Sequence, residues 1–437
     1  MNPVNVGLLG LGTVGGGTLN VLTRNADEIA RRAGRGIRIT HAAAKAFDPS
    51  QLNGLDTLEI TDDAFSVVSN PDVEIVIELI GGYSPARELV LKAIENGKHV
   101  VTANKALIAM HGNEIFEAAQ KHGVTVAFEA AVAGGIPIIK AVREGLAANR
   151  IEWIAGIING TGNFILTEMR DKGREFADVL KEAQALGYAE ADPTFDVEGI
   201  DAAHKLTILG SIAFGIPLQF EKTYTEGITR IEPQDVVYAN DFGYQIKHLG
   251  ITRMTPRGIE MRVHPTMIPR RRLIANVDGV MNALLVKGDA VGPTLYYGAG
   301  AGSEPTASAV LADVVDVVRA MTSDPENRVP HLAFQPGELF DLPILPIEEV
   351  ESAYYLRMQV EDQPGVMARI ATILADSGIS IEAIQQKEPS EGRSNVPLVM
   401  LTHVVQEKKL NEAIAAIEAL DSVSGQIMRI RVERLDG

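Results

Sequence analysis

The feature that most restricts the fold of this chain is a short glycine-rich segment close to its N-terminus. Residues 4–9 form an apolar run typical of a buried strand, and Gly10-Leu11-Gly12-Thr13-Val14-Gly15 follows it directly. Between a strand and a helix, the pattern G-x-G-x-x-G is the phosphate-binding turn of a dinucleotide-binding βαβ unit. Gly10 permits the tight turn, Gly12 lets the pyrophosphate approach the backbone, and Gly15 lets the helix pack on the strand. The segment therefore predicts a dinucleotide bound at a helix N-terminus.

The following residues repeat the alternation of strand and helix. Apolar, β-branched runs predict further strands at residues 37–44, 74–79, 99–102 and 124–128. Helices are predicted between them at residues 20–32, 84–96 and 112–122. Strands without polar alternation are buried on both faces, as in a parallel sheet covered by helices. Residues 1–130 are therefore expected to form a doubly wound Rossmann domain of the α/β class.

The rest of the chain divides into three parts. Residues 131–302 predict an α+β domain, and a helix at about 303–322 is expected to complete the first domain. Prolines accumulate in residues 323–352, which predicts a linker. Residues 353–437 follow the order strand, helix, strand, strand, helix, strand, which predicts a small ferredoxin-like domain.

Composition excludes several classes of function. The 437 residues include 40 Lys and Arg against 57 Asp and Glu, and this net charge of −17 argues against nucleic-acid or anionic-membrane partners. No apolar run approaches the roughly 18 residues that span a bilayer. The absence of cysteine removes disulfides and thiolate chemistry, and no signal-peptide pattern opens the chain, so a cytoplasmic protein is expected.

Two lysines are the strongest candidates for chemistry. Lys105 follows the carboxyl end of a predicted strand, the edge where open α/β sheets bind ligands. Lys205 and Asp201 are four residues apart in a helix that is apolar around most of its circumference, so they share one face of a buried helix. Buried charged pairs rarely stabilise more than apolar packing does, which favours a functional cavity over a surface ion pair.

Charged residues at three other positions suggest ligand contacts. No carboxylate ends the second predicted strand, where an NAD site usually has one, and Lys45 would instead suit the 2′-phosphate of NADP(H). Lys45 could equally be a solvated lysine. Glu190, Asp192 and Asp196 lie in one short loop that suits an amino-acid ammonium group, although a solvated acidic turn explains Asp192 or Asp196 equally well.

Other catalytic patterns are absent. The chain has no G-x-S-x-G nucleophile motif and no H-E-x-x-H metal motif. His204 is next to Lys205 in sequence but points about 100° away on a helix, which predicts a packing role.

Together, several motifs resemble homoserine dehydrogenase over residues 4–321. They are residues 10–15, Thr102-Ala103-Asn104-Lys105, residues 128–137, Ile158-Asn159-Gly160-Thr161, Gly187-Tyr188-Ala189-Glu190-Ala191-Asp192-Pro193 and residues 201–205. Gly162 stands where members of the family usually carry a second threonine. Residues 360–366 resemble the first loop of an ACT regulatory domain.

The resemblance implies reversible, NAD(P)H-dependent reduction of L-aspartate 4-semialdehyde to L-homoserine, in threonine, methionine and isoleucine biosynthesis. By this resemblance, Lys205 donates the proton, and Lys105 lies at the nicotinamide and the substrate. Glu190 and Asp201 hold the substrate and the lysine network. Asp196 is a further substrate contact. Cofactor contacts are implied at residues 10–15, Lys45, Thr102, Ala103, Lys105, Gly187 and Gly302. A structural Na⁺ is implied at backbone oxygens of Glu129, Val132, Gly134 and Ile136.

The family also implies a homo-oligomer, either dimer or tetramer, with residues 131–302 as the catalytic and dimerisation domain and L-threonine as an effector at the ACT domain. NADP(H) is expected as the preferred cofactor, with NAD(H) possible. Two alternatives remain at the level of sequence: a non-catalytic dinucleotide and amino-acid sensor, and another ACT-containing hydroxy-acid dehydrogenase.

Overall fold

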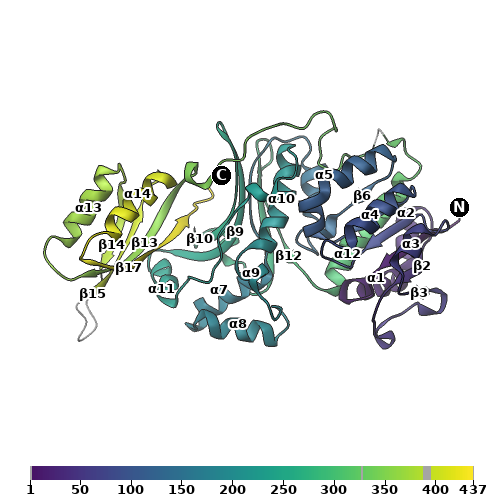
Figure 1. Cartoon of the computed structure of the whole chain (residues 1–437), viewed down its shortest axis with the longest axis horizontal. Coiled ribbons are helices and arrows are strands. Elements are labelled where there is room, and N and C mark those ends of the chain that lie inside the picture. Colours follow the sequence, from purple (N-terminus) through teal and green to yellow (C-terminus); the bar gives the residue numbers. More distant parts are fainter. Residues whose placement is uncertain (1, 326–327, 387–394, 437) are drawn as a thin grey trace. The chain divides into compact units, whose positions relative to one another are not determined.

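The computed structural model describes residues 2–325, 328–386 and 395–436. The chain forms two compact units, each assembled from segments that are far apart in sequence (Figure 1). The first unit contains residues 1–160, 201–223 and 280–342, and the second contains residues 161–200, 224–279 and 343–437.

A six-stranded parallel sheet begins the first unit. Its order is β3-β2-β1-β4-β5-β6, so the strand order reverses between β1 and β4. The strands are β1 (Val4–Leu9), β2 (Ile37–Ala43), β3 (Glu59–Thr61), β4 (Ile75–Glu78), β5 (His99–Thr102) and β6 (Val126–Ala127). This order confirms the predicted doubly wound fold and places its ligand crevice at the carboxyl ends of the strands beside the reversal.

The helices of this sheet differ from the prediction at their boundaries. The helix predicted at residues 20–32 has the wrong start and is interrupted at Asn25, because α1 (Thr13–Arg24) starts directly after Gly12 and α2 (Ala26–Ala33) follows Asn25. The helix predicted at residues 112–122 is too short, because α5 (Lys105–Lys121) begins at Lys105 itself. The short α3 (Ala64–Ser69) and β3 were not predicted, whereas α4 (Ala86–Glu95) was.

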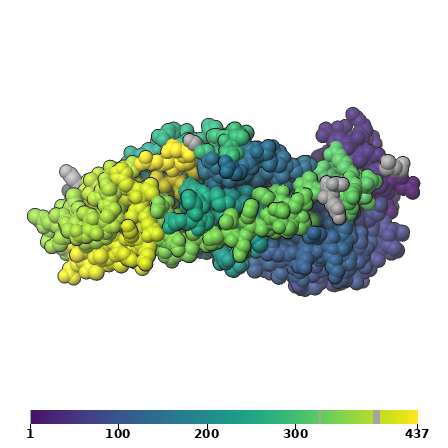
Figure 2. Space-filling model, turned by 90° about the horizontal axis from the view of Figure 1, so that it is seen from above, coloured from purple at the N-terminus to yellow at the C-terminus, as the bar shows by residue number. Residues whose placement is uncertain are grey.

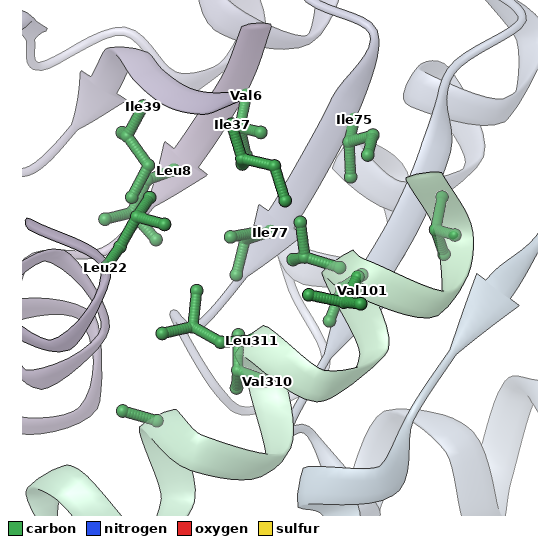
Figure 3. Close-up of a cluster of buried hydrophobic side chains, with 14 of the residues drawn as sticks. Val6, Leu8, Leu22, Ile37, Ile39, Ile75, Ile77, Val101, Val310 and Leu311 are labelled. Atoms are coloured by element: carbon green, nitrogen blue, oxygen red, sulfur yellow. The ribbon is translucent and has the colours of Figure 1, made fainter. Parts of the chain in front are cut away.

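A helix from much later in the chain covers one face of the sheet. Val310 and Leu311 of α12 (Ser303–Ala320) pack in one cluster with β-strand side chains that include Ile77 and Val101 (Figure 3). These four side chains are almost fully buried. Burying a side chain of this size stabilises a fold by roughly 1.5–3 kcal/mol, so α12 is an integral part of this core.

The rest of the first unit contains an antiparallel sheet and a buried helix. In the sheet, β11 (Met281–Gly288) pairs with both β7 (Ile151–Ile157) and β12 (Gly292–Ala299). The buried helix is α10 (Ile200–Phe214), and the short α6 (Ile138–Lys140) precedes β7.

Proline-rich residues near the end of the first unit pack against its surface. The green atoms of this segment border blue atoms of the Rossmann part (Figure 2). The His331 ring stacks on Phe116, with 4.7 Å between ring centroids, and its Nε2 accepts a hydrogen bond from the Val126 amide at 3.2 Å. The predicted linker is therefore partly ordered by side-chain contacts.

The second unit combines helices with a mixed sheet of order β9-β10-β17-β13-β15-β14. Its first elements are α7 (Gly160–Lys172), which starts at the end of the first unit, α8 (Phe176–Ala185), α9 (Thr194–Val197), β8 (Tyr224–Thr225), α11 (Pro233–Asp241), β9 (Tyr244–Thr255) and β10 (Gly258–Pro269). Its last elements are β13 (Glu351–Glu361), α13 (Val366–Asp376), β14 (Ile381–Gln386), β15 (Asn395–Thr402), β16 (Val405–Gln406), α14 (Glu407–Glu418) and β17 (Val423–Val432). The predicted βαββαβ order of the C-terminal part is confirmed, and β17 also pairs in parallel with β10.

A buried ion pair joins β13 to α11 within this unit. Arg357 Nε donates to Asp235 Oδ1 at 2.6 Å, and Arg357 Nη2 donates to Asp235 Oδ2 at 3.1 Å. Asp235 is fully buried and also accepts a hydrogen bond from the Tyr355 hydroxyl at 2.9 Å. The bidentate geometry makes the contact specific, and its burial makes removal of one partner costly.

We predict that Arg357→Met lowers the apparent free energy of unfolding of the second unit by about 3–5 kcal/mol, because Asp235 stays buried without its cation. Thermal and urea denaturation measure this effect. Adding Asp235→Asn to the variant is expected to restore part of the loss, and Arg369→Met, on the exposed face of α13, serves as the control. A loss of unfolding free energy no larger than that of the control would contradict a stabilising role for the Arg357–Asp235 pair.

Candidate active site

Lys105 is held at the carboxyl edge of the parallel sheet by a chain of hydrogen bonds. Glu78, at the end of β4, is fully buried, and its Oε2 accepts from the Thr102 hydroxyl at 2.7 Å. Thr102 Oγ1 in turn accepts from the Asn104 amide at 3.0 Å. Asn104 then caps α5 by accepting from the Leu107 amide. Lys105 is the first residue of that helix, so this network fixes the point where its side chain leaves the sheet.

Asp201 and Lys205 meet Lys105 in one cluster of the first unit. Lys205 Nζ donates to Asp201 Oδ2 at 2.7 Å and to the Ile158 carbonyl at 2.8 Å. Asn159 Nδ2 donates to the same carboxylate oxygen at 2.9 Å. Lys105 Nζ lies 2.9 Å from Asp201 Oδ1. The predicted pair is therefore a triad in which one carboxylate bridges two ammonium groups.

The three side chains differ in their access to solvent. Asp201 is 7% exposed and Lys205 is 10% exposed, whereas Lys105 is 42% exposed. Burial alone would raise the pKa of Asp201, but the charges of Lys205 and Lys105 outweigh it and hold that pKa well below its usual range. Asp201 is therefore an anion at any physiological pH, and it fixes two cations beside the sheet edge.

The neighbouring histidine has the packing role predicted for it. The His204 ring stacks on Phe220 with 4.3 Å between centroids. Burial lowers the pKa of His204 to about 4, so the ring is neutral at physiological pH.

The glycine-rich turn has the shape that a dinucleotide phosphate needs. Gly10 has a φ of 99°, in the left-handed region, and α1 starts at Thr13 with Gly12 as its N-cap. A Cβ atom on Gly15 would lie 2.0 Å from the Gly10 carbonyl oxygen, whereas a Cβ on Gly12 would meet nothing within 4 Å. There is thus no room for a side chain at Gly15, where the helix packs on the strand, and there is open space at Gly12, where the phosphate would lie. These residues therefore fit the cofactor.

The remaining predicted cofactor residues lie at helix or strand boundaries. Lys45 is exposed, two residues beyond the end of β2, and Gly302 directly precedes α12. Thr102 is the last residue of β5, and Ala103 lies between β5 and α5. Gly187, in the second unit, follows α8 with a φ of 75°. As cofactor contacts, Lys45, Gly302, Thr102, Ala103 and Gly187 stay predictions.

The acidic residues predicted to bind substrate belong to the second unit. Glu190 has an exposed side chain, and its carbonyl accepts a hydrogen bond from Gln184 Nε2 at 3.0 Å. Asp192 accepts from both the amide and the hydroxyl of Thr194, which is the turn structure that the alternative reading of this residue predicted. Asp196 is half-buried in α9. Glu190 and Asp196 stay predictions as substrate ligands.

The segment assigned to Na⁺ forms an irregular turn. Ala133 and Gly134 have φ values of 54° and 38°. The Glu129 carboxylate is already used, because it accepts from the amides of Ile139 and Lys140. Within residues 2–325, 328–386 and 395–436, no group of three His, Cys, Asp or Glu side chains could hold a metal. A cation here would depend on backbone oxygens, which are hard ligands of the right kind for Na⁺.

Sequence reasoning missed two positioning residues of this site. Glu78 is the one acid in β4 and stands at its carboxyl end, so its position was the available signal. Asn104 occupies the residue before a helix, which is a frequent place for an N-cap.

The fold and these sites define an NAD(P)-dependent oxidoreductase with a C-terminal ACT domain. Models of the families "Homoserine dehydrogenase, NAD binding domain", "Homoserine dehydrogenase" and "ACT domain" match residues 10–129, 137–315 and 354–422. The chain is 70% identical to a homoserine dehydrogenase of Pseudomonas aeruginosa over the full length of both chains. It therefore belongs to the homoserine dehydrogenase family, whose members interconvert L-aspartate 4-semialdehyde and L-homoserine.

Solved structures agree with this assignment. A homoserine dehydrogenase from Thiobacillus denitrificans is 68% identical, with a TM-score of 0.95 over 100% of this chain and 99% of that one. A hyperthermophilic archaeal homoserine dehydrogenase in complex with NADPH is 25% identical, with a TM-score of 0.61 over 72% of this chain and 97% of that one. Among the described residues, no helix is both long and apolar enough to cross a membrane.

Proposed function

We propose that Lys205 protonates the substrate oxygen during reduction of L-aspartate 4-semialdehyde, and that Lys105 stabilises the negative charge on that oxygen. The observation that carries this proposal is the bridge from Asp201 to both ammonium groups. The bridge orients two cations at the sheet edge where this fold binds its ligands.

The chemistry follows from the charge that develops. When bound, the nicotinamide supplies a hydride to the aldehyde carbon, and negative charge then grows on the carbonyl oxygen. Preoriented ammonium groups stabilise that charge without reorganisation, and a proton from Lys205 Nζ completes the alcohol. Asp201 and the Ile158 carbonyl hold Lys205 in place during the transfer. The reverse reaction uses the neutral Lys205 amine as a base.

We assign substrate binding to Lys105, Asp201, Glu190 and Asp196. The carboxylates of Glu190 and Asp196 suit the ammonium group of the amino acid. Lys105 suits an anionic oxygen, and Asp201 holds Lys105 in position. Loop residue Glu190 is exposed and available to a ligand.

Lys205→Ala is expected to reduce kcat by about a hundredfold or more, because general acids contribute effects of this size. Folding should be retained, since Asp201 keeps Lys105 and Asn159 as partners. Steady-state NADPH oxidation with aspartate semialdehyde measures kcat, and circular dichroism monitors folding. Lys222→Ala, an exposed lysine of the same unit, is the control. A folded Lys205→Ala enzyme with turnover within a few fold of the parent would remove Lys205 from the proton-donor role.

We propose a preference for NADP(H) over NAD(H), supported by the exposed Lys45 just beyond β2. The parent is expected to show a higher kcat/KM with NADPH than with NADH. Lys45→Glu should lower the ratio of kcat/KM with NADPH to kcat/KM with NADH by about tenfold or more. A carboxylate repels the 2′-phosphate of NADPH and accepts a hydrogen bond from the ribose hydroxyl of NADH. Equal ratios in parent and variant would show that Lys45 does not set the preference.

We also assign a structural Na⁺ to the backbone oxygens of Glu129, Val132, Gly134 and Ile136. The irregular turn with left-handed Ala133 supports this assignment, because such a backbone can direct several carbonyls to one point. The cation would fix the turn that precedes α6 and takes no part in the reduction.

We further propose feedback inhibition by L-threonine at the loop that joins β13 to α13, in a homo-oligomer that pairs ACT domains. Gly365 is the N-cap of α13 with a φ of 88°, and the first amides of the helix can bind a carboxylate. A chain ending near Glu349 would be a poor test, because it would lack β17 and Glu433, the residue after β17. Glu433 pairs with Arg262, whose fully buried guanidinium would then lose this partner. Point variants of the full chain are the better choice.

Gly365→Asp is expected to weaken threonine inhibition by about tenfold or more, because it places a carboxylate beside the amides that would bind the carboxylate of the ligand. Gly378→Asp is the matched control, since Gly378 also has a positive φ and open surroundings, at the other end of α13. Activity against threonine concentration measures both. If parent and Gly365→Asp are inhibited alike, threonine does not act at this loop.

A further inference from the structure

The short turn between β7 and α7 supplies two of the contacts that hold the catalytic pair. Its Ile158 carbonyl accepts from Lys205 Nζ at 2.8 Å, and its Asn159 Nδ2 donates to Asp201 Oδ2 at 2.9 Å. A displacement of this turn would therefore weaken the hold on both catalytic side chains. The position of the turn depends in its own right on what fixes the start of α7, which begins at Gly160.

The first turn of α7 is a poor helix former by itself. Gly160 and Gly162 both belong to it, and glycine lowers the stability of a helix by up to about 1 kcal/mol relative to alanine. Neither glycine has a side chain that could anchor the helix. Contacts from other residues must therefore fix this end of α7.

Asn163 anchors the first turn of α7 to the loop at residues 277–280. Its side chain is almost fully buried, and its Nδ2 donates to two carbonyl oxygens of that loop, at 3.0 Å each. The last residue of the loop packs against Gly160, because a Cβ on Gly160 would lie 2.7 Å from the Val280 carbonyl oxygen. The loop therefore holds the start of α7 at two points.

A buried lysine of β9 completes this anchor. Lys247 is 1% exposed, and its Nζ donates to Asn163 Oδ1 at 3.2 Å. The same ammonium group donates to the Val277 carbonyl at 2.6 Å and to Asp278 Oδ1 at 3.0 Å. All three protons of one ammonium group thus serve the two segments that have to stay together.

Charged groups of α7 and of the loop act on this ammonium group. Asp278 is 43% exposed and also accepts from Arg170 Nη1 at 2.8 Å, and Arg170 pairs with Asp171 at 2.7 Å. Burial lowers the pKa of Lys247 to about 8, although the charges of Asp278 and Asp171 oppose this shift. Lys247 is therefore mostly protonated at pH 7.

A buried cation is a costly way to join two segments. Apolar packing of the same volume would stabilise this region at least as well. Apolar packing has no direction, however, whereas the hydrogen bonds of Lys247 fix one register between α7 and the loop. The directional contact favours a role in positioning over a role in stability alone.

We propose that Lys247 is a positioning residue for the reduction, because its ammonium group fixes the start of α7 and thereby keeps the preceding turn in register with Lys205 and Asp201. The inference rests on the proton-donor role proposed for Lys205. Lys247 acts through the turn and not on the reacting atoms.

Lys247→Met tests this role, because methionine removes the charge and keeps a side chain of similar length. We expect kcat to fall by about tenfold or more, since a small misplacement of catalytic groups has effects of this size. The Kd of NADPH, measured by fluorescence titration, should stay within about twofold of the parent, because Lys247 lies outside the Rossmann domain and its glycine-rich turn.

Lys98→Met is the matched control for the loss of a buried ammonium group. Lys98 is 4% exposed, and its Nζ also donates to two backbone carbonyls, those of Asn70 and Val73. Urea denaturation measures the stability lost by each variant. If folded Lys247→Met loses no more kcat than Lys98→Met does, the positioning role is overturned.

A double-mutant cycle shows whether Lys247 acts through Lys205. In the Lys205→Ala background, Lys247→Met should lower kcat by no more than about twofold further, because the proton donor that it positions is gone. If the two losses multiply, Lys247 does not act through Lys205 and the inference is wrong, while the proton-donor role stands. If Lys205→Ala alone keeps the turnover of the parent, the proposed function fails and the positioning role fails with it.

Asp278→Asn replaces Lys247→Met if that variant does not fold. Asp278 is partly exposed, so folding should be retained. Loss of its carboxylate lowers the pKa of Lys247 further, and the ammonium group is then lost at a lower pH. The fall of kcat on the alkaline side should therefore begin about half a pH unit or more below that of the parent. An unchanged pH profile of kcat would overturn the role of Lys247.

Discussion

The carboxylate of Asp201 is the interaction on which the catalytic arrangement depends. Two lysine side chains from separate elements would repel each other at the edge of a sheet, and each would avoid a buried position. With Asp201 between them, one ammonium group can be almost fully buried in α10 while the other stays accessible at the start of α5. The same carboxylate accepts a hydrogen bond from Asn159. One carboxylate in this cluster therefore connects α5, α10 and the residues before α7.

Much of this arrangement can be predicted from the sequence because it depends on local patterns. The spacing of Asp201 and Lys205 on an apolar helix identifies a buried pair, and the position of Lys105 after a strand places it at the ligand edge. The bridge from Lys105 to Asp201 could not be predicted, since it joins residues far apart in the chain and depends on tertiary packing. Glu78 was missed for a related reason: its partners are backbone amides and Thr102, which no spacing rule connects to it.

The boundaries of α1 illustrate how tertiary contacts override local preference. Gly15, Gly16 and Gly17 lower the intrinsic helix propensity of this segment, yet all three are part of α1. Close packing of α1 requires glycine there, because a Cβ on Gly17 would lie 2.4 Å from Ser303 Oγ, at the start of α12. The glycines thus lower the stability of the isolated helix and permit close packing with a distant one. The short, exposed β3 has too few apolar residues to be recognised from sequence.

The position of α12 in the chain also affects how the protein is made. The last strand of the parallel sheet ends at Ala127, but the helix that supplies Val310 and Leu311 to the same core starts at Ser303. At ribosomal speeds of 5–20 residues per second, the sheet waits roughly 10–35 s for this helix. During that interval the apolar face that α12 later covers is open to water and to other nascent chains. The Rossmann domain therefore completes its core later in synthesis than a contiguous domain of the same size would.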